Sequence, residues 1–147
     1  MGALLKWSLT SLLLACSFHP ATASAEQAKH FGDYVVHYNT LSTDILEPGV
    51  AKEYDIQRSR SRAMITITVI HQGDGKAVPA ELKVTSGMLT GHKQSLEMHE
   101  IREGDAIYYI SDFPVAHRDT LNFAVRVKPE GSQQSHTFEF EKQFFTE

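Results

Sequence analysis

Apolar and polar residues alternate along much of the chain, in short runs rather than long ones. Residues 121–127 carry Leu, Phe or Val at every odd position, and this period of two predicts a strand with one buried face. Residues 63–70 are mostly β-branched or apolar and predict a second strand. Five further runs are similar, at residues 34–38, 77–86, 94–102, 106–110 and 135–145. The pattern therefore predicts about seven short strands.

Glycine, proline and aspartate separate these runs. The Gly-Asp-Gly-Lys sequence at residues 73–76 predicts a hairpin turn, and Pro79 predicts that the next strand begins at a sheet edge. Residues 47–54 predict a short helical turn, with Pro48 near its start. Short strands at this spacing, without a longer helical pattern, predict an all-β fold, an antiparallel β-sandwich. An immunoglobulin-like topology is the leading interpretation.

The aromatic residues give finer expectations. Phe138, Phe140 and Phe144 recur at even positions, so a regular strand places them on one face. We expect the first two in the core and Phe144 at the less covered end. Tyr108 and Tyr109 are adjacent and must point to opposite faces, so we expect one of them to point inward.

The first 25 residues differ in composition from the rest. Lys6 is their only charged residue, residues 7–18 are mostly apolar, and Ala-Ser-Ala follows at 23–25. This order is typical of a cleaved secretory signal peptide. The apolar run is shorter than the about 20 residues of a spanning helix, and no second run follows it. We therefore expect a periplasmic protein without a membrane span. Its signal peptide would comprise residues 1–25 and be cleaved after Ala25, and residues 26–147 would form a single domain.

Cys16 leaves an alternative open. The sequence LLAC at residues 13–16 resembles a bacterial lipobox, in which the cysteine is acylated after cleavage. The well-formed Ala-Ser-Ala site favours soluble export over this lipid anchor.

Composition excludes several classes of function. The chain has 18 acidic residues and 14 Lys and Arg, so its formal charge is −4. The charge becomes −5 when Lys6 is removed with the signal peptide. This charge gives no electrostatic reason to bind nucleic acid, for which a basic excess is expected. One cysteine cannot form an intramolecular disulfide, a four-cysteine zinc site or an iron–sulfur cluster. No H-E-x-x-H, G-x-S-x-G or phosphate-binding glycine loop occurs, so we assign no catalytic residue and no cofactor.

Two separated blocks of sequence resemble a known bacterial family. The first block is FGDYVVHYN at residues 31–39, LEPGVA at 46–51 and YDIQRS at 54–59, and the second is EGDAIYYI at 103–110. Both are similar to domain of unknown function 4426, a family of small exported proteins of gammaproteobacteria. The resemblance covers nearly the whole mature chain, although Gly49 stands where the family pattern has an acidic residue. It implies a periplasmic β-sandwich and brings no activity and no catalytic residue.

Histidine and methionine raise the question of a metal site, because imidazole and thioether suit copper. Met98 and His99 are adjacent, so on a regular strand they point to opposite faces and cannot easily hold one ion. We expect Met98 to point inward and His99 into solvent, and we assign no metal ligand. The other candidates are His30, His37, His71, His92, His117, His136, Met64 and Met88.

Charged residues give two weaker candidates. Three arginines alternate with serine, at Arg58, Arg60 and Arg62. On one strand face they would form a ladder able to clamp carboxylates or phosphates, but a solvated, charged sheet edge is the favoured interpretation. Three carboxylates lie near one predicted turn, at Glu100, Glu103 and Asp105. Acid–base catalysis by such a group needs a cleft, which the sequence does not show.

These observations favour an exported, non-enzymatic binding or accessory module. Its partner would be an unidentified envelope protein or ligand, contacted through sheet edges and loops. The alternative, motivated by the histidines and methionines, is a periplasmic protein that handles copper or zinc. A hydrolase is the third class, and it would require a polar concave site.

Overall fold

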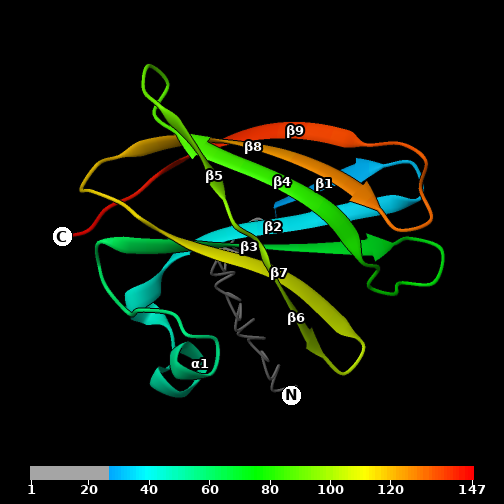
Figure 1. Cartoon of the computed structure of the whole chain (residues 1–147), viewed down its shortest axis with the longest axis horizontal. Helices are drawn as coiled ribbons and strands as arrows, with labels where there is room; N and C mark the ends of the chain where they lie inside the picture. Colours follow the sequence, from blue (N-terminus) through cyan, green and yellow to red (C-terminus); the bar gives the residue numbers. More distant parts are fainter. Residues whose placement is uncertain (1–26) are drawn as a thin grey trace, which may run out of the picture.

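A computed structural model describes residues 27–147 (Figure 1). The expected signal peptide at residues 1–25, with Cys16 and the cleavage site after Ala25, lies outside the described residues. No helix in the described part is long and apolar enough to cross a membrane. The elements are β1 (Gln27–Phe31), β2 (Tyr34–Ser42), η1 (Thr43–Ile45), α1 (Pro48–Glu53), β3 (Arg62–His71), β4 (Ala80–Gly87), β5 (Lys93–Leu96), β6 (His99–Glu103), β7 (Ala106–Pro114), β8 (Thr120–Pro129) and β9 (His136–Gln143).

The strands form two antiparallel sheets that face each other. Sheet A has the order β1-β2-β3-β7-β6, and sheet B has the order β5-β4-β8-β9. Apart from β1, these orders match the A-B-E-D and C′-C-F-G sheets of an immunoglobulin-like sandwich. The predicted all-β sandwich and its topology are therefore confirmed.

The core lies between the two sheets. Alternate residues of β8, from Leu121 to Val127, are buried, as the period of two predicts. Ile65 and Ile67 of β3 face them from sheet A, and Phe113 of β7 packs on Phe123 of β8 with ring centroids 5.5 Å apart. Burying a side chain of this size contributes about 1.5–3 kcal/mol, so this layer holds the sheets together.

Nine strands occur within residues 27–147, where about seven were predicted. β1 is one addition, and the single strand predicted at residues 94–102 is two strands. β5 pairs with β4 in sheet B and β6 pairs with β7 in sheet A, so the chain crosses between the sheets at Glu97 and Met98. Met98 packs against the core and His99 is exposed, as expected.

The predicted turn at residues 73–76 is present, but it does not lead into a long hairpin. Gly75 has a φ of +69°, and the Gly75 N–H donates to the His71 carbonyl at 2.9 Å. Only one bridge, between Ile70 and Ala77, links the strand after the turn to β3. Pro79 has no N–H to extend that ladder, and β4 begins at Ala80 in the other sheet.

The expectation for the last strand is correct for only one of its three phenylalanines. Phe138 is buried as expected, whereas Phe140 is half-buried and Phe144 is buried. The reason is a backbone clasp beyond β9, because the Phe144 N–H donates to Asp119 and the Phe144 carbonyl accepts from Arg118, both at 2.8 Å. The clasp turns the Phe144 ring into the end of the core.

Candidate functional site

The outward faces of the two sheets differ in chemistry. Sheet B carries polar or charged residues on its outward face, among them Glu81, Lys83, Asn122, Arg126, Glu139 and Glu141. Sheet A instead directs Met64 of β3, Ile101 of β6 and Ile110 of β7 into a second apolar cluster outside the main core. Because hydrated apolar surface is unfavourable, this face of sheet A needs a cover.

Residues 43–61, which connect β2 to β3, supply part of that cover (Figure 1). The helix α1 places Ala51 in the second cluster together with Ile56. The helix ends in a Schellman motif, because the Ile56 N–H donates to the Ala51 carbonyl at 2.8 Å and the Asp55 N–H donates to Lys52 at 3.4 Å. Asp55 has a left-handed φ of 54°, a conformation that glycine favours and aspartate tolerates. We call residues 43–61 the cap segment.

Thr43 fixes the two ends of the cap segment together. Its side chain is fully buried. Its hydroxyl donates to the Gln57 carbonyl at 2.8 Å and accepts from the Ser59 N–H at 3.0 Å. The cap segment is therefore a closed loop anchored on a buried hydroxyl, which holds α1 in place over sheet A.

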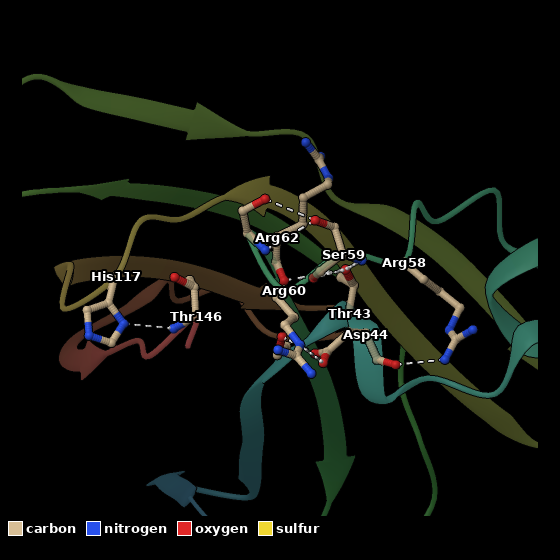
Figure 2. Close-up of polar contacts among 10 residues, drawn as sticks. Thr43, Asp44, Arg58, Ser59, Arg60, Arg62, His117 and Thr146 are labelled. Atoms are coloured by element: carbon tan, nitrogen blue, oxygen red, sulfur yellow. Dashed lines mark hydrogen bonds and ion pairs between the residues drawn. The ribbon is translucent and has the colours of Figure 1, made fainter.

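The three arginines do not form a ladder. β3 begins only at Arg62, so Arg58 and Arg60 precede the strand, and both contact Asp44 (Figure 2). Arg58 donates to the Asp44 carbonyl at 2.8 Å, and Arg60 Nε lies 3.8 Å from Asp44 Oδ2. Arg62 Nε donates to Asp112 of β7 at 2.8 Å. Arg58 and Arg62 are therefore held by hydrogen bonds within the fold, whereas Arg60 stays an exposed side chain with one long ion pair.

A groove remains between the cap segment and sheet A. Tyr54 and Ile56 from the cap segment and Ile101 and Ile110 from the sheet line both of its adjoining hollows. The apolar hollow has a volume of about 180 Å³ and is also lined by Leu46, Val50, Met64, Thr66, Glu103 and Tyr108. The other hollow has a volume of about 400 Å³ and is also lined by Glu53, Asp55, His99, Ser111 and Asp112.

Negative charge gathers along the groove. Glu53, Asp55 and Glu103 are exposed, and within residues 27–147 none of them forms an ion pair. Asp112 differs, because it is half-buried and Arg62 neutralises it. The groove therefore combines an apolar wall with unneutralised carboxylates at both ends.

A hollow separate from the groove, the end cleft, opens between the two sheets and has a volume of about 370 Å³. The Tyr109 hydroxyl donates to Glu100 Oε2 at 2.9 Å and accepts from the Ala80 N–H at 2.8 Å. Arg102 Nε donates to Glu100 Oε1 at 2.6 Å. The bond from Arg102, followed by that from Tyr109, lowers the pKa of the Glu100 carboxyl, and burial raises the pKa of the Tyr109 hydroxyl.

This network links three strands, β4, β6 and β7. Glu100 and the Tyr109 hydroxyl each have a protein partner, so we interpret the network as a structural connection between the sheets. Of the three carboxylates that the sequence places near one turn, Glu100 lines the end cleft and Glu103 lines the groove. Asp105 lines neither the end cleft nor the groove.

The structure does not bring the histidines and methionines together on one element. They lie on β1, β2, β3, β6, β9 and several loops, and only His99 and Met64 line the groove. Within residues 27–147, no three His, Cys, Asp or Glu side chains are placed to hold a metal ion. Some of these residues have local partners. His71 Nδ1 lies 3.0 Å from Asp74, which lowers the pKa of that carboxyl, and His117 Nδ1 accepts from the Thr146 N–H at 3.3 Å (Figure 2).

Sequence reasoning missed the groove, although one signal for it exists. Ile107, Tyr108, Tyr109 and Ile110 of β7 are all apolar or aromatic, without alternation. A strand of this composition has both faces covered. Tyr109 is the inward residue of the pair and Tyr108 points outward into the second cluster, as their adjacency required.

Comparisons with known proteins support this description of the fold. A family model described as domain of unknown function (DUF4426) matches residues 28–147. A crystal structure of a DUF4426 family protein from Pseudomonas aeruginosa is similar at 35% sequence identity and a TM-score of 0.72, covering 82% of this chain and 94% of that one. No curated protein matches the chain.

Two more distant structures are both of FetP from uropathogenic Escherichia coli. One is a copper-bound variant, with 10% identity, a TM-score of 0.60 and coverage of 82% of this chain and 95% of that one. The other is the protein as isolated after recombinant expression in the periplasm of Escherichia coli, with 10% identity, a TM-score of 0.59 and coverage of 82% and 93%. At this identity the similarity concerns the fold alone.

Proposed function

The chain belongs to the family described as domain of unknown function, DUF4426, and we propose that it is an exported, non-enzymatic binding module whose contact surface is the groove. The observation that carries this proposal is the incomplete cover of sheet A. The cap segment is firmly anchored through Thr43, yet it leaves an apolar hollow open beside exposed carboxylates. A preformed hollow with a few polar groups at its margin is the usual form of a binding site.

The chemistry of the groove favours binding over catalysis. Its unneutralised carboxylates, Glu53, Asp55 and Glu103, are all exposed to water. Acid–base catalysis by a carboxyl group depends on a sheltered environment that separates the pKa values of two groups. Glu100 and Tyr109 of the end cleft are already hydrogen-bonded to each other.

The proposal of export rests on residues 1–25, whose composition is typical of a signal peptide. Periplasmic fractionation followed by mass spectrometry of the intact protein tests it. We expect a mature chain that begins at Glu26. An acylated chain that begins at Cys16 would replace soluble export by the lipid anchor, and a cytoplasmic chain that retains Met1 would refute export.

Site-specific crosslinking tests the groove as the contact surface. Val50 lies at the groove and is 41% exposed, so a photoreactive residue placed there would touch a bound partner. Glu139, on the polar outward face of sheet B, is the matched control position. We expect a discrete adduct in living cells from position 50 that disappears when Ile101→Glu places a charge in the groove. Equal adducts from both positions, or none from position 50, would refute the proposal.

The metal-handling alternative stays a prediction with its own test. Titration of the protein with Cu(I), Cu(II) and Zn(II) measures it directly. Affinity tighter than micromolar that is lost on His99→Ala would favour a metal site at the groove over a partner site.

A further inference from the structure

The free edge of sheet A runs along the groove. β6 is the last strand of the sheet and pairs only with β7. Its outward-facing residues His99, Ile101 and Glu103 all line the groove. An unpaired strand edge offers backbone N–H and C=O groups to another extended segment.

The register shows which backbone groups of β6 are available. Glu103 and Ala106 pair across the two-residue turn Gly104-Asp105, and the residues that flank such a turn form a hydrogen-bonded pair. Pairs then alternate along the ladder, so Arg102 and Glu100 direct their backbone N–H and C=O groups away from β7.

The side chains of β6 do not block this edge. Glu100 and Arg102 point inward and neutralise each other at 2.6 Å, and β6 contains no lysine and no proline. Inward-pointing charges, lysine and proline commonly prevent pairing at a sheet edge. In β6 the inward charges neutralise each other, and lysine and proline are absent.

We propose that β6 and the groove together bind an extended peptide segment of a partner protein, which adds to sheet A as a sixth strand and carries an apolar residue between two basic ones. This inference rests on the proposed function and names the chemistry of the partner. On the outward face, the residue opposite Ile101 lies within about 5 Å of it, Cβ to Cβ, beside the apolar hollow.

The negative charge of the groove determines which residues we expect on either side of the apolar residue of the peptide. Positions two residues away on the same face of the added strand lie opposite Glu103 at one end and His99 at the other. The second of these is next to the hollow lined by Glu53 and Asp55. Lysine or arginine at both positions would meet carboxylates that have no ion-pair partner among residues 27–147.

A peptide titration tests this inference on protein expressed from its full sequence and labelled with ¹⁵N for NMR. The probe is acetyl-Thr-Lys-Thr-Leu-Thr-Lys-Thr-amide, and the matched control has Glu in place of both Lys residues. We expect the basic peptide to shift amide signals of β6 and of residues 48–56, while the acidic peptide binds at least roughly tenfold more weakly.

Variants of the protein separate the contribution of the carboxylates to peptide binding from that of the strand edge. Glu53→Gln combined with Asp55→Asn removes two exposed charges, and Asn keeps the tolerance for a positive φ at position 55, so we expect weaker binding by a folded protein. Arg102→Pro removes the outward N–H and should abolish binding. Arg102→Ala also removes the ion pair with Glu100 but keeps that N–H, so it should bind the peptide more tightly than Arg102→Pro does.

Several results would overturn the inference. These are equal binding of the two peptides, shifts confined to β1, β5 or β9, loss of binding in Arg102→Ala as severe as in Arg102→Pro, and binding of n-hexylammonium as tight as that of the basic peptide. The last result would make the groove a site for a small amphiphilic cation. If neither peptide binds while the crosslink from Val50 persists, this inference fails and the proposed function stands.

Discussion

Tyr109 is the residue through which the two sheets share a polar network. Its hydroxyl accepts from the Ala80 N–H of sheet B and donates to Glu100 of sheet A. Tyr109→Phe would leave the half-buried Ala80 N–H without this acceptor, at a cost of about 1–3 kcal/mol in the free energy of unfolding. Tyr108→Phe is the control, because no hydrogen bond to its hydroxyl occurs within the described residues. Urea denaturation measures both, and equal effects would contradict the role of the Tyr109 hydroxyl.

Glu100 makes the stability of the fold depend on pH in the acidic range. Its folded-state pKa is lowered below 4.5, chiefly by the bond from Arg102, so its contribution is present above that pH. The contribution is lost as the pH falls through the folded-state pKa. Glu100→Gln should therefore reduce the difference in melting temperature between pH 7 and pH 3. Glu139→Gln, at an exposed position of β9, is the control and should change that difference less than Glu100→Gln does. An equal or larger change in Glu139→Gln would contradict the role of Glu100.

At the scale of elements, β9 and the segment after it contribute unequally to the core. Phe144 contacts Phe113 with ring centroids 5.9 Å apart and is buried, whereas Phe140 is half-buried. Phe144→Ala should cost about 3–5 kcal/mol in the free energy of unfolding, and Phe140→Ala should cost less. Thermal melts of both variants, with Glu139→Ala as the surface control, measure the order. A larger loss of stability for Phe140→Ala than for Phe144→Ala would contradict the greater contribution of Phe144 to the core.

Gly49 and Gly87 differ in the space that a Cβ atom would find at each position. A Cβ at Gly49, in the first turn of α1, meets nothing within 4 Å, so Gly49→Ala should stabilise the protein by about 0.5–1 kcal/mol through helix propensity. A Cβ at Gly87, at the end of β4, would lie 2.6 Å from the His92 carbonyl oxygen. Gly87→Ala should therefore destabilise the β4–β5 hairpin by about 1–3 kcal/mol. Calorimetric melts of both variants test the difference in sign, and a shift in the same direction would contradict it.

At the scale of the whole molecule, the sequence pattern predicts the sandwich because inward and outward residues alternate. Residues 121–127 show this directly, and so do residues 63–70 on their inward face. It fails where burial does not follow alternation. The chain crosses between the sheets at Met98 without interrupting the alternation of apolar residues, so residues 94–102 look like one strand in the sequence. The burial of Phe144 depends on a backbone clasp formed with residues 118 and 119.

The groove escaped prediction for a related reason. Its walls come from the cap segment and β3 on one side and from β6 and β7 on the other, and the cap segment at residues 43–61 is separated in the sequence from β6, which begins at His99. The unbroken apolar run in β7 indicates a covered outward face, but only the position of α1 shows that the cover is partial. The acidic lining depends on Asp55 at a helix end and Glu103 at a turn, which no local motif joins.

Hydrogen–deuterium exchange of the protein, free and bound to the partner that crosslinking identifies, tests whether the groove is the contact surface. We expect slower amide exchange in residues 48–56 and 99–103 on binding, because those residues form the groove and its free strand edge. Exchange in β4, β8 and β9 of sheet B should remain unchanged. Protection confined to sheet B, with unchanged exchange in residues 48–56 and 99–103, would show that the groove is not the contact surface.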